Sequence, residues 1–151
     1  QPKDLIAQLK ALLEIEHLHF IPWDINDFTG HADGMLRFID EQTVLINDYA
    51  KEDKKFQLEF LKFINNTGLN TIEMPYHPPY DATYTSAAGL YLNYLEMEQA
   101  VLFPVFEFKH DEKALQVMQQ VVKNKPVVPI IYHELAQYGG IINCITWNIK
   151  A

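Results

Sequence analysis

Three stretches of the chain carry apolar residues at every third or fourth position, which is the spacing of one face of a helix. Pro2 suits the first position of the first helix, and Asp111 suits the capping position before the third. The second stretch stops at Asn65, Asn66 and Gly68. The apolar positions are Leu5, Ile6, Leu9, Leu12 and Leu13, then Phe56, Phe60, Phe63 and Ile64, then Ala114, Leu115, Met118, Val121 and Val122. The pattern predicts three amphipathic helices, and the apolar face of the first needs a sheet to cover it.

Short apolar runs bounded by turn residues lie between these helices, and such runs are typical of β-strands. Pro22 ends one of them and Pro75 ends another, while residues 40–42 read as a turn. The predicted strands are residues 18–21, 30–39, 43–46, 71–74, 90–95, 100–103, 127–131 and 140–149, with 30–39 paired to 43–46 and 90–95 paired to 100–103 as hairpins.

The two predicted hairpins resemble each other in sequence. EQTVLI at 41–46 matches EQAVLF at 98–103, and the order helix, strand, hairpin returns along the chain. We therefore predict an α/β fold of repeated modules, roughly 1–50, 51–108 and 109–151, amounting to two full repeats and most of a third. An ordinary mixed α/β domain, whose hairpins resemble each other by chance, is the alternative.

Composition narrows the classes of function. The 151 residues are 48% hydrophobic, enough to bury the core of one globular unit. A net charge of -8 and a pI near 5.1, with Arg37 as the one arginine, argue against nucleic-acid binding and favour cationic ligands. No apolar run approaches the roughly 20 residues of a membrane span. The single cysteine excludes an intrachain disulfide framework, so we expect a reducing, cytoplasmic location.

That cysteine, Cys144, lies in the last predicted strand, 140–149, shortly after the glycine pair Gly139 and Gly140. Glycines permit backbone conformations closed to other residues and a close approach of main chain to a ligand. In a strand, Cys144 would face opposite to its neighbour Asn143. Taken alone, an unpaired cysteine is a small buried hydrophobe as readily as a nucleophile, and the choice depends on a histidine nearby.

His31 and Asp33 are two residues apart in the predicted strand 30–39, so both side chains should leave one face. If the repeats surround a common axis, the junctions at Gly30 and Gly140 are equivalent and His31 meets Cys144. An imidazole beside a thiol lowers the thiol's pKa or takes its proton. Asp33 would then orient the imidazole or bind a cation. The alternative is a histidine and aspartate pair satisfied by backbone groups in a loop.

Four segments together resemble the C-terminal half of the bacterial Porphyromonas-type peptidylarginine deiminase and agmatine deiminase family. They are TGHADGMLRF at 29–38, AGLYLNY at 88–94, DEKAL at 111–115 and GGIINCIT at 139–146, in the order and spacing of that family. The resemblance implies the pentein fold, an α/β-propeller of five helix-and-strand modules, of which this chain holds about two and a half to three. The chain is thus expected to begin within a longer protein, whose N-terminal modules are absent from it.

The same resemblance implies hydrolysis of a guanidine C–N bond, without a cofactor, through a covalent intermediate. It places Cys144 on the nucleophile, His31 on the general acid/base and Asp33 on a carboxylate that grips a guanidinium. Agmatine or another small cationic guanidine is the expected substrate, with a role in putrescine biosynthesis. Peptidylarginine in proteins is the alternative substrate within the family. Two other functions are also possible alternatives: that of an amidinotransferase and that of a non-catalytic pentein binding module.

Two departures from the family pattern stand out. Agmatine deiminases usually carry histidine where this chain has Asn143, and no acidic residue here matches the family's second guanidinium-binding carboxylate, which belongs to the N-terminal half. We expect the chain to self-associate or to pair with that missing half. His17 and His19 are two apart, but without cysteine support we expect no metal site there.

Overall fold

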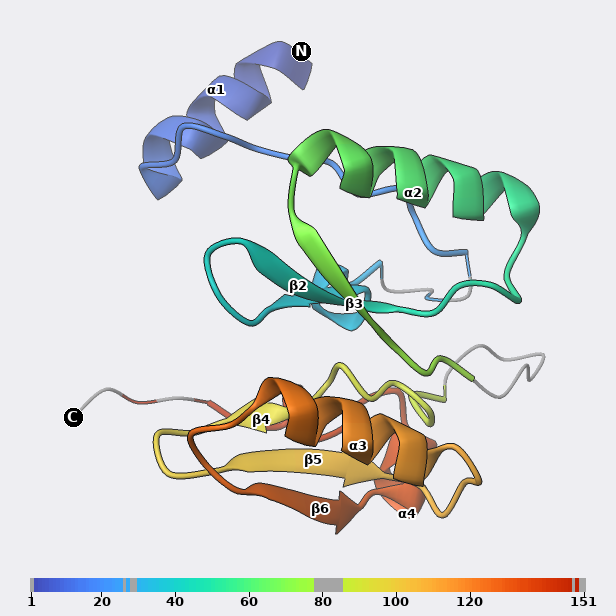
Figure 1. Cartoon of the computed structure of the whole chain (residues 1–151). Coiled ribbons are helices and arrows are strands. Elements are labelled where there is room, and N and C mark those ends of the chain that lie inside the picture. The colour runs from blue at the N-terminus through green and yellow to red at the C-terminus, as the bar shows by residue number, and fades with distance from the viewer. Residues whose placement is uncertain (1, 26, 28–29, 78–85, 148, 150–151) are drawn as a thin grey trace.

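The computed structural model describes residues 2–25, 27, 30–77, 86–147 and 149. It contains two three-stranded sheets, each covered by one helix (Figure 1). In chain order the elements are α1 (Pro2–Leu13), the 3-10 turn η1 (Ala32–Gly34), β1 (Leu36–Phe38), β2 (Thr43–Asn47), α2 (Lys54–Thr67), β3 (Asn70–Met74), β4 (Leu95–Glu96), β5 (Val101–Val105), α3 (Asp111–Val121), β6 (Val127–Ile131) and α4 (His133–Ala136). All three predicted helices are confirmed.

Each sheet is built in the same way. In the first, β1 pairs antiparallel with β2, and the chain then crosses through α2 and returns as β3, parallel to β2, with Thr43 opposite Asn70. In the second, β4 pairs antiparallel with β5, and α3 leads to β6, parallel to β5, with Val101 opposite Val127. The predicted internal repeat is thus present as two ββαβ units, in strand orders β1-β2-β3 and β4-β5-β6.

The central strand β2 is buried on both faces, and this joins the two units. Val44 and Ile46 pack with Phe60 and Ile64 of α2, whereas Leu45, between them, belongs to the larger core around β5 and α3. Adjacent strand residues point to opposite faces, so one sheet contributes to two cores. The rest of the larger core includes Met74, Tyr91, Leu92, Phe103, Phe106, Met118 and Ile141.

The helix ends follow from local chemistry. Asp53 caps α2, because its carboxylate accepts hydrogen bonds from the N–H groups of Lys55 and Phe56, and Gly68 ends the helix with φ of 72°. The prediction for α3 was wrong by one residue: His110 is the cap and Asp111 is the first helical residue. Asp111 instead accepts hydrogen bonds from two preceding N–H groups and from the Tyr91 hydroxyl.

The apolar face predicted for α1 is not covered by a sheet. Leu5, Leu12 and Leu13 are 57%, 79% and 57% exposed, and α1 stands away from both sheets (Figure 1). Within the described residues, no helix is long and apolar enough to cross a bilayer.

Several predicted strands are shorter than expected or absent. Residues 18–21 form no strand, and neither does the described part of 140–149, which excludes 148. Of residues 30–39 only Leu36–Phe38 form a strand, and of residues 90–95 only Leu95 does, as the first residue of β4. Residues 91–95 are all buried, and Ile141 and Ile142 are buried in succession. These stretches are apolar because they line the core, and apolar character alone does not distinguish a buried turn from a buried strand such as β2.

Candidate active site

Cys144 lies on a turn, so the predicted terminal strand was wrong. Its N–H donates to the carbonyl oxygen of Ile141 at 3.0 Å, and the Thr146 hydroxyl donates to the carbonyl oxygen of Ile142 at 2.9 Å. Burial of Ile141 and Ile142 anchors this turn to the core, while Cys144 itself is exposed. The thiol is therefore accessible, and the alternative of a buried structural cysteine is excluded.

The glycine pair before Cys144 has the expected structural reason. Gly139 has φ of 86°, a conformation that side chains disfavour. A Cβ on Gly140 would lie 3.2 Å from Cβ of Cys144 and 3.8 Å from its Sγ. A side chain at position 140 would therefore crowd the thiol.

His31 and Asp33 also lie on a turn and not on a strand face. Ala32–Gly34 forms η1, with His31 as its cap. The backbone N–H of His31 donates to Oδ2 of Asp27 at 2.7 Å, which holds the start of the turn. The side chains of His31 and Asp33 are exposed. The argument from shared strand geometry was wrong, although both residues do project from one short segment.

Asn143 joins this turn to the cysteine. Its side-chain Nδ2 donates to Oδ2 of Asp33 at 3.0 Å, across 110 positions of sequence. The structure thus brings Asp33 to the residue directly before Cys144. His31 is two residues from Asp33 on the same turn, and within the described residues the hydrogen bond to the thiol comes from a different side chain, Asn93.

Asn93 is the residue that the sequence analysis missed. Its side chain is 5% exposed; Nδ2 donates to Sγ of Cys144 at 3.0 Å, and Oδ1 accepts from the backbone N–H of Asn143 at 2.9 Å. The signal was one amide within an otherwise apolar and aromatic run, at the centre of residues 90–95. A polar side chain buried in such a run needs partners, and here the partners are the cysteine turn.

A histidine pair connects the two units at another point. The rings of His77 and His110 stack with centroids 3.6 Å apart, and Nζ of Lys51 lies 3.2 Å from Nδ1 of His77. Desolvation, followed by repulsion from neighbouring cationic groups, lowers the pKa of both histidines below the ordinary value. Among the described residues, no group of three or more His, Cys, Asp or Glu side chains is placed to hold a metal ion.

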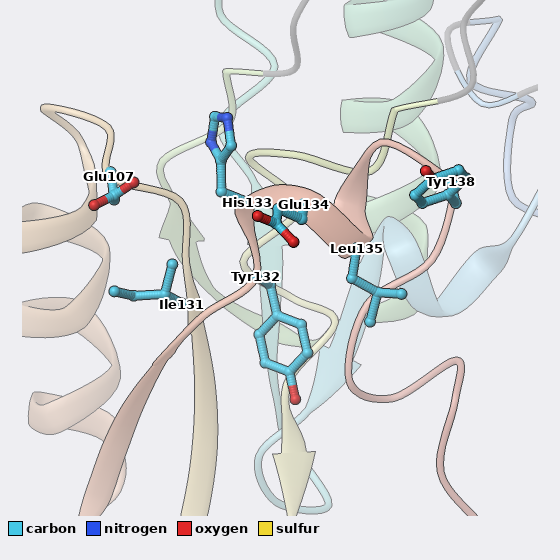
Figure 2. Close-up of a pocket in the computed structure, with 7 residues that line it drawn as sticks. All are labelled: Glu107, Ile131, Tyr132, His133, Glu134, Leu135 and Tyr138. Carbon is cyan, nitrogen blue, oxygen red and sulfur yellow. The ribbon is translucent and has the colours of Figure 1, made fainter.

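A separate hollow of about 530 Å³ opens beside α4 (Figure 2). It is lined by Glu107, Ile131, Tyr132, His133, Glu134, Leu135 and Tyr138. Glu107 has φ of 60°, unusual for a residue with a side chain. None of the three predicted site residues lines this hollow. The group formed by Cys144, Asn93, Asn143 and Asp33 therefore remains the better candidate for an active site.

A model of the Porphyromonas-type peptidyl-arginine deiminase family matches residues 1–149. The chain belongs to this family. A curated relative from Latilactobacillus sakei, named "Putative agmatine deiminase", is 26% identical over 172 residues, which cover 95% of this chain and 47% of the relative. The chain thus spans about half the length of that member of the family.

Solved structures of family relatives show the same fold. The agmatine deiminase of C. jejuni matches with a TM-score of 0.78 at 18% identity, over 95% of this chain and 46% of that one. The agmatine deiminase of Enterococcus faecalis matches with a TM-score of 0.75 at 18% identity, over 96% and 47%. These likenesses establish the α/β fold that was expected from the resemblance; the count of five modules and the module boundaries stay predictions.

Proposed function

We propose that the complete protein containing this chain hydrolyses a C–N bond of a guanidine, releasing ammonia and a ureido product. The observation that carries the proposal is the cluster in which Asn143 and Asn93 hold Asp33 and Cys144 together from distant parts of the sequence. The relatives are agmatine deiminases by name, which supports guanidine chemistry at such a site.

Asp33 is proposed to bind the substrate. A guanidinium is planar and permanently charged, and its N–H donors suit a carboxylate. Asp33 is exposed on η1, and the net charge of -8 favours a cationic substrate in the surrounding field. A further carboxylate, from the part of the relatives' length that this chain does not span, would complete the site.

Cys144 and His31 are proposed to carry the chemistry. The Cys144 thiolate attacks the central guanidinium carbon, and ammonia leaves with a proton supplied by the His31 imidazolium. Water then adds to the resulting thiouronium carbon while His31 takes the water's proton. The C–S bond breaks, the ureido product leaves and the thiolate is regenerated. The exposure of both side chains leaves them open to a substrate.

The substrate is proposed to be a small guanidine such as agmatine, with peptidylarginine as the competing choice. Asn143, at the position where agmatine deiminases usually carry histidine, is neutral at every pH and already donates to Asp33. Turnover of agmatine and of a blocked arginine peptide, measured side by side, decides between the two.

The test of the proposed function is Cys144→Ala in the complete protein, with ammonia release as the assay. We expect release to fall to background while the circular dichroism spectrum is unchanged, because Cys144 is exposed and contributes little packing. Thr146→Ser, which keeps the hydroxyl that donates to the Ile142 carbonyl, serves as the matched control and should retain activity. Unchanged ammonia release in Cys144→Ala would show that the protein uses another nucleophile, and no release from the wild-type protein would show that it is a binding module.

A further inference from the structure

Asn47, the last residue of the buried strand β2, holds the end of the η1 turn. Its side chain is 2% exposed, and its Nδ2 donates to the carbonyl oxygen of Gly34 at 2.8 Å. Its backbone N–H donates to the carbonyl oxygen of Met35 at 3.4 Å. Gly34 directly follows Asp33, so Asn47 fixes the backbone beside the proposed substrate carboxylate.

The side-chain amide of Asn47 acts through its donor end. Besides the Gly34 carbonyl, Nδ2 reaches the hydroxyl oxygen of Tyr49 at 3.2 Å, whereas Oδ1 accepts no hydrogen bond from the described residues. A side chain of similar size without an N–H group would therefore lose both contacts and leave a buried carbonyl oxygen without its donor, which is costly.

The other end of the same segment is held by Asp24. Its side chain is 3% exposed, and its Oδ2 accepts from the hydroxyl of Tyr76, which follows β3, at 3.2 Å. The carbonyl oxygen of Asp24 accepts from the N–H of Asp27 at 3.1 Å, and the Asp27 carboxylate accepts from the N–H of His31. Tyr76 thus supports the backbone at His31 through two aspartates.

Tyr49 connects the two ends. Its hydroxyl oxygen accepts from Asn47, and its ring packs against that of Tyr76 with centroids 5.0 Å apart. Burial, followed by the charge of Asp24, raises the pKa of both tyrosines above the ordinary value. Both hydroxyls therefore keep their protons and can donate. Asp24, Asn47, Tyr49 and Tyr76 form one buried polar cluster behind the turn.

We propose that Asn47 and Tyr76 are positioning residues of the site: Asn47 sets the place of Asp33 through Gly34, and Tyr76 sets the backbone of His31 through Asp24 and Asp27. The proposal rests on the proposed function, because that function gives Asp33 and His31 their roles. Asn47 and Tyr76 are themselves 2% and 5% exposed, so each acts through the turn and not by touching the substrate.

Three variants of the complete protein separate these roles. Asn47→Leu keeps about the same size and removes the donor to Gly34, and Asn47→Ala, which needs no added space, replaces it if the leucine protein does not fold. Tyr76→Phe removes only the hydroxyl. Val44→Ala is the control, because Val44 lies on the same strand but packs in the core beneath α2; it lowers stability without touching η1.

The first readout is hydrogen exchange, followed by mass spectrometry of the peptide that contains η1. The N–H groups of Gly34 and Met35 close this turn on the carbonyl oxygens of His31 and Ala32. We expect both to exchange at least about tenfold faster in the Asn47 variant, because a buried carbonyl loses its donor and the turn opens locally. Exchange in Val44→Ala should stay within about twofold of the wild type.

The second readout is steady-state kinetics with agmatine or the blocked arginine peptide, whichever is turned over. The Asn47 variant should mainly raise KM, by about tenfold, since Asp33 binds the substrate. Tyr76→Phe should mainly lower kcat, by about tenfold, since misplaced catalytic groups slow the chemical step. Val44→Ala should change neither.

An Asn47 variant with wild-type exchange at η1 and wild-type KM would overturn the proposal for Asn47, and a wild-type kcat in Tyr76→Phe would overturn it for Tyr76. Hydrogen exchange does not depend on turnover. A wild-type protein that releases no ammonia would therefore refute the proposed function, while the effect of Asn47 on η1 would still be measured.

Discussion

The guanidinium of Arg37 lies 4.4 Å from the centroid of the Tyr94 ring and stacks over its face. The same guanidinium donates from Nη1 to the carbonyl oxygens of Leu92 and Tyr94, at 3.3 and 3.2 Å. Arg37 belongs to β1, and its three contacts lie in the segment that leads into β4. One side chain therefore ties the first ββαβ unit to the loop that carries Asn93.

This tie predicts a large effect of Arg37→Met on stability. The variant leaves two carbonyl oxygens without their charged donor and removes the cation–π contact, so the free energy of unfolding should fall by about 1.5–3 kcal/mol. Arg37→Lys should recover only part of this loss, because an ammonium lacks the planar fork. Urea denaturation measures the free energy of unfolding of both Arg37 variants, and Lys62→Met, on the exposed side of α2, serves as a control. Equal midpoints for Arg37→Met and wild type would contradict the prediction.

His31→Gln is predicted to remove the proton transfers of the reaction. One group donates a proton to ammonia and then takes one from water, and a glutamine side chain can do neither. The rate of ammonia release should therefore fall about 100-fold or more. Cys144 should still be alkylated in the variant. A rate of ammonia release close to that of the wild type would assign His31 a structural role.

The stacked pair of His77 and His110 predicts that acid destabilises the fold. The pKa of each lies below the ordinary 6.5 in the folded protein, so the unfolded chain binds protons first as pH falls. Their contribution to stability is complete above about pH 6.5 and is lost as the pH drops through and below that value. The charged groups facing the pair are Lys51, Lys109 and Lys113, which oppose protonation, and Asp48 and Asp111, which favour it.

Urea denaturation between pH 8 and pH 5 checks this prediction. His110→Gln removes one histidine and also relieves the repulsion that His110 exerts on His77, so it should flatten the pH slope more than His77→Gln does. The double variant should flatten the slope most. A slope that is unchanged in the double variant would show that other groups cause it.

The 151-residue chain alone is predicted to be a poor catalyst. Asp33 provides charge on one side of a guanidinium, and the loss of a second carboxylate should slow turnover by at least about a hundredfold relative to the complete protein. The exposed leucines of α1 and the 89% exposed Trp147 should make the chain self-associate. Sedimentation and ammonia release test both expectations; a monomeric chain with the full activity of the complete protein would contradict them.

The helices were predictable because their signals are local. Apolar spacing, the Asp53 cap and Gly68 act within a few residues of α2, and the parallel strands β3 and β6 are bounded by equally local turns. The turn at Cys144 was not predictable in the same way. It is held by the burial of Ile141 in a core whose other residues, such as Leu45 and Tyr91, lie far away in the sequence.

Cys144, His31 and Asp33 were singled out from their types and spacing, and the family resemblance supplied their expected roles, whereas the contacts between them are seen only in the fold. Asn93 and Asn143 are polar residues without a distinctive spacing, and their contacts join positions 50 to 110 residues apart. An amide in an apolar run signals that a partner exists, but the sequence does not say which. The roles of Cys144, His31 and Asp33 stay predictions that the variants above are designed to test.

Pro129 in the middle of β6 affects how the second sheet can grow. The carbonyl of Pro126 accepts from Val101, and the N–H of Tyr132 donates to Val105, so backbone groups of even-numbered residues point toward β5. Alternation places the backbone of Pro129 on the open edge of β6, and proline has no N–H to offer there. An incoming strand would meet a missing donor at the centre of its ladder. This edge is thereby protected against the strand-by-strand addition that leads to fibrils, and copies of the chain should associate through their exposed apolar side chains instead.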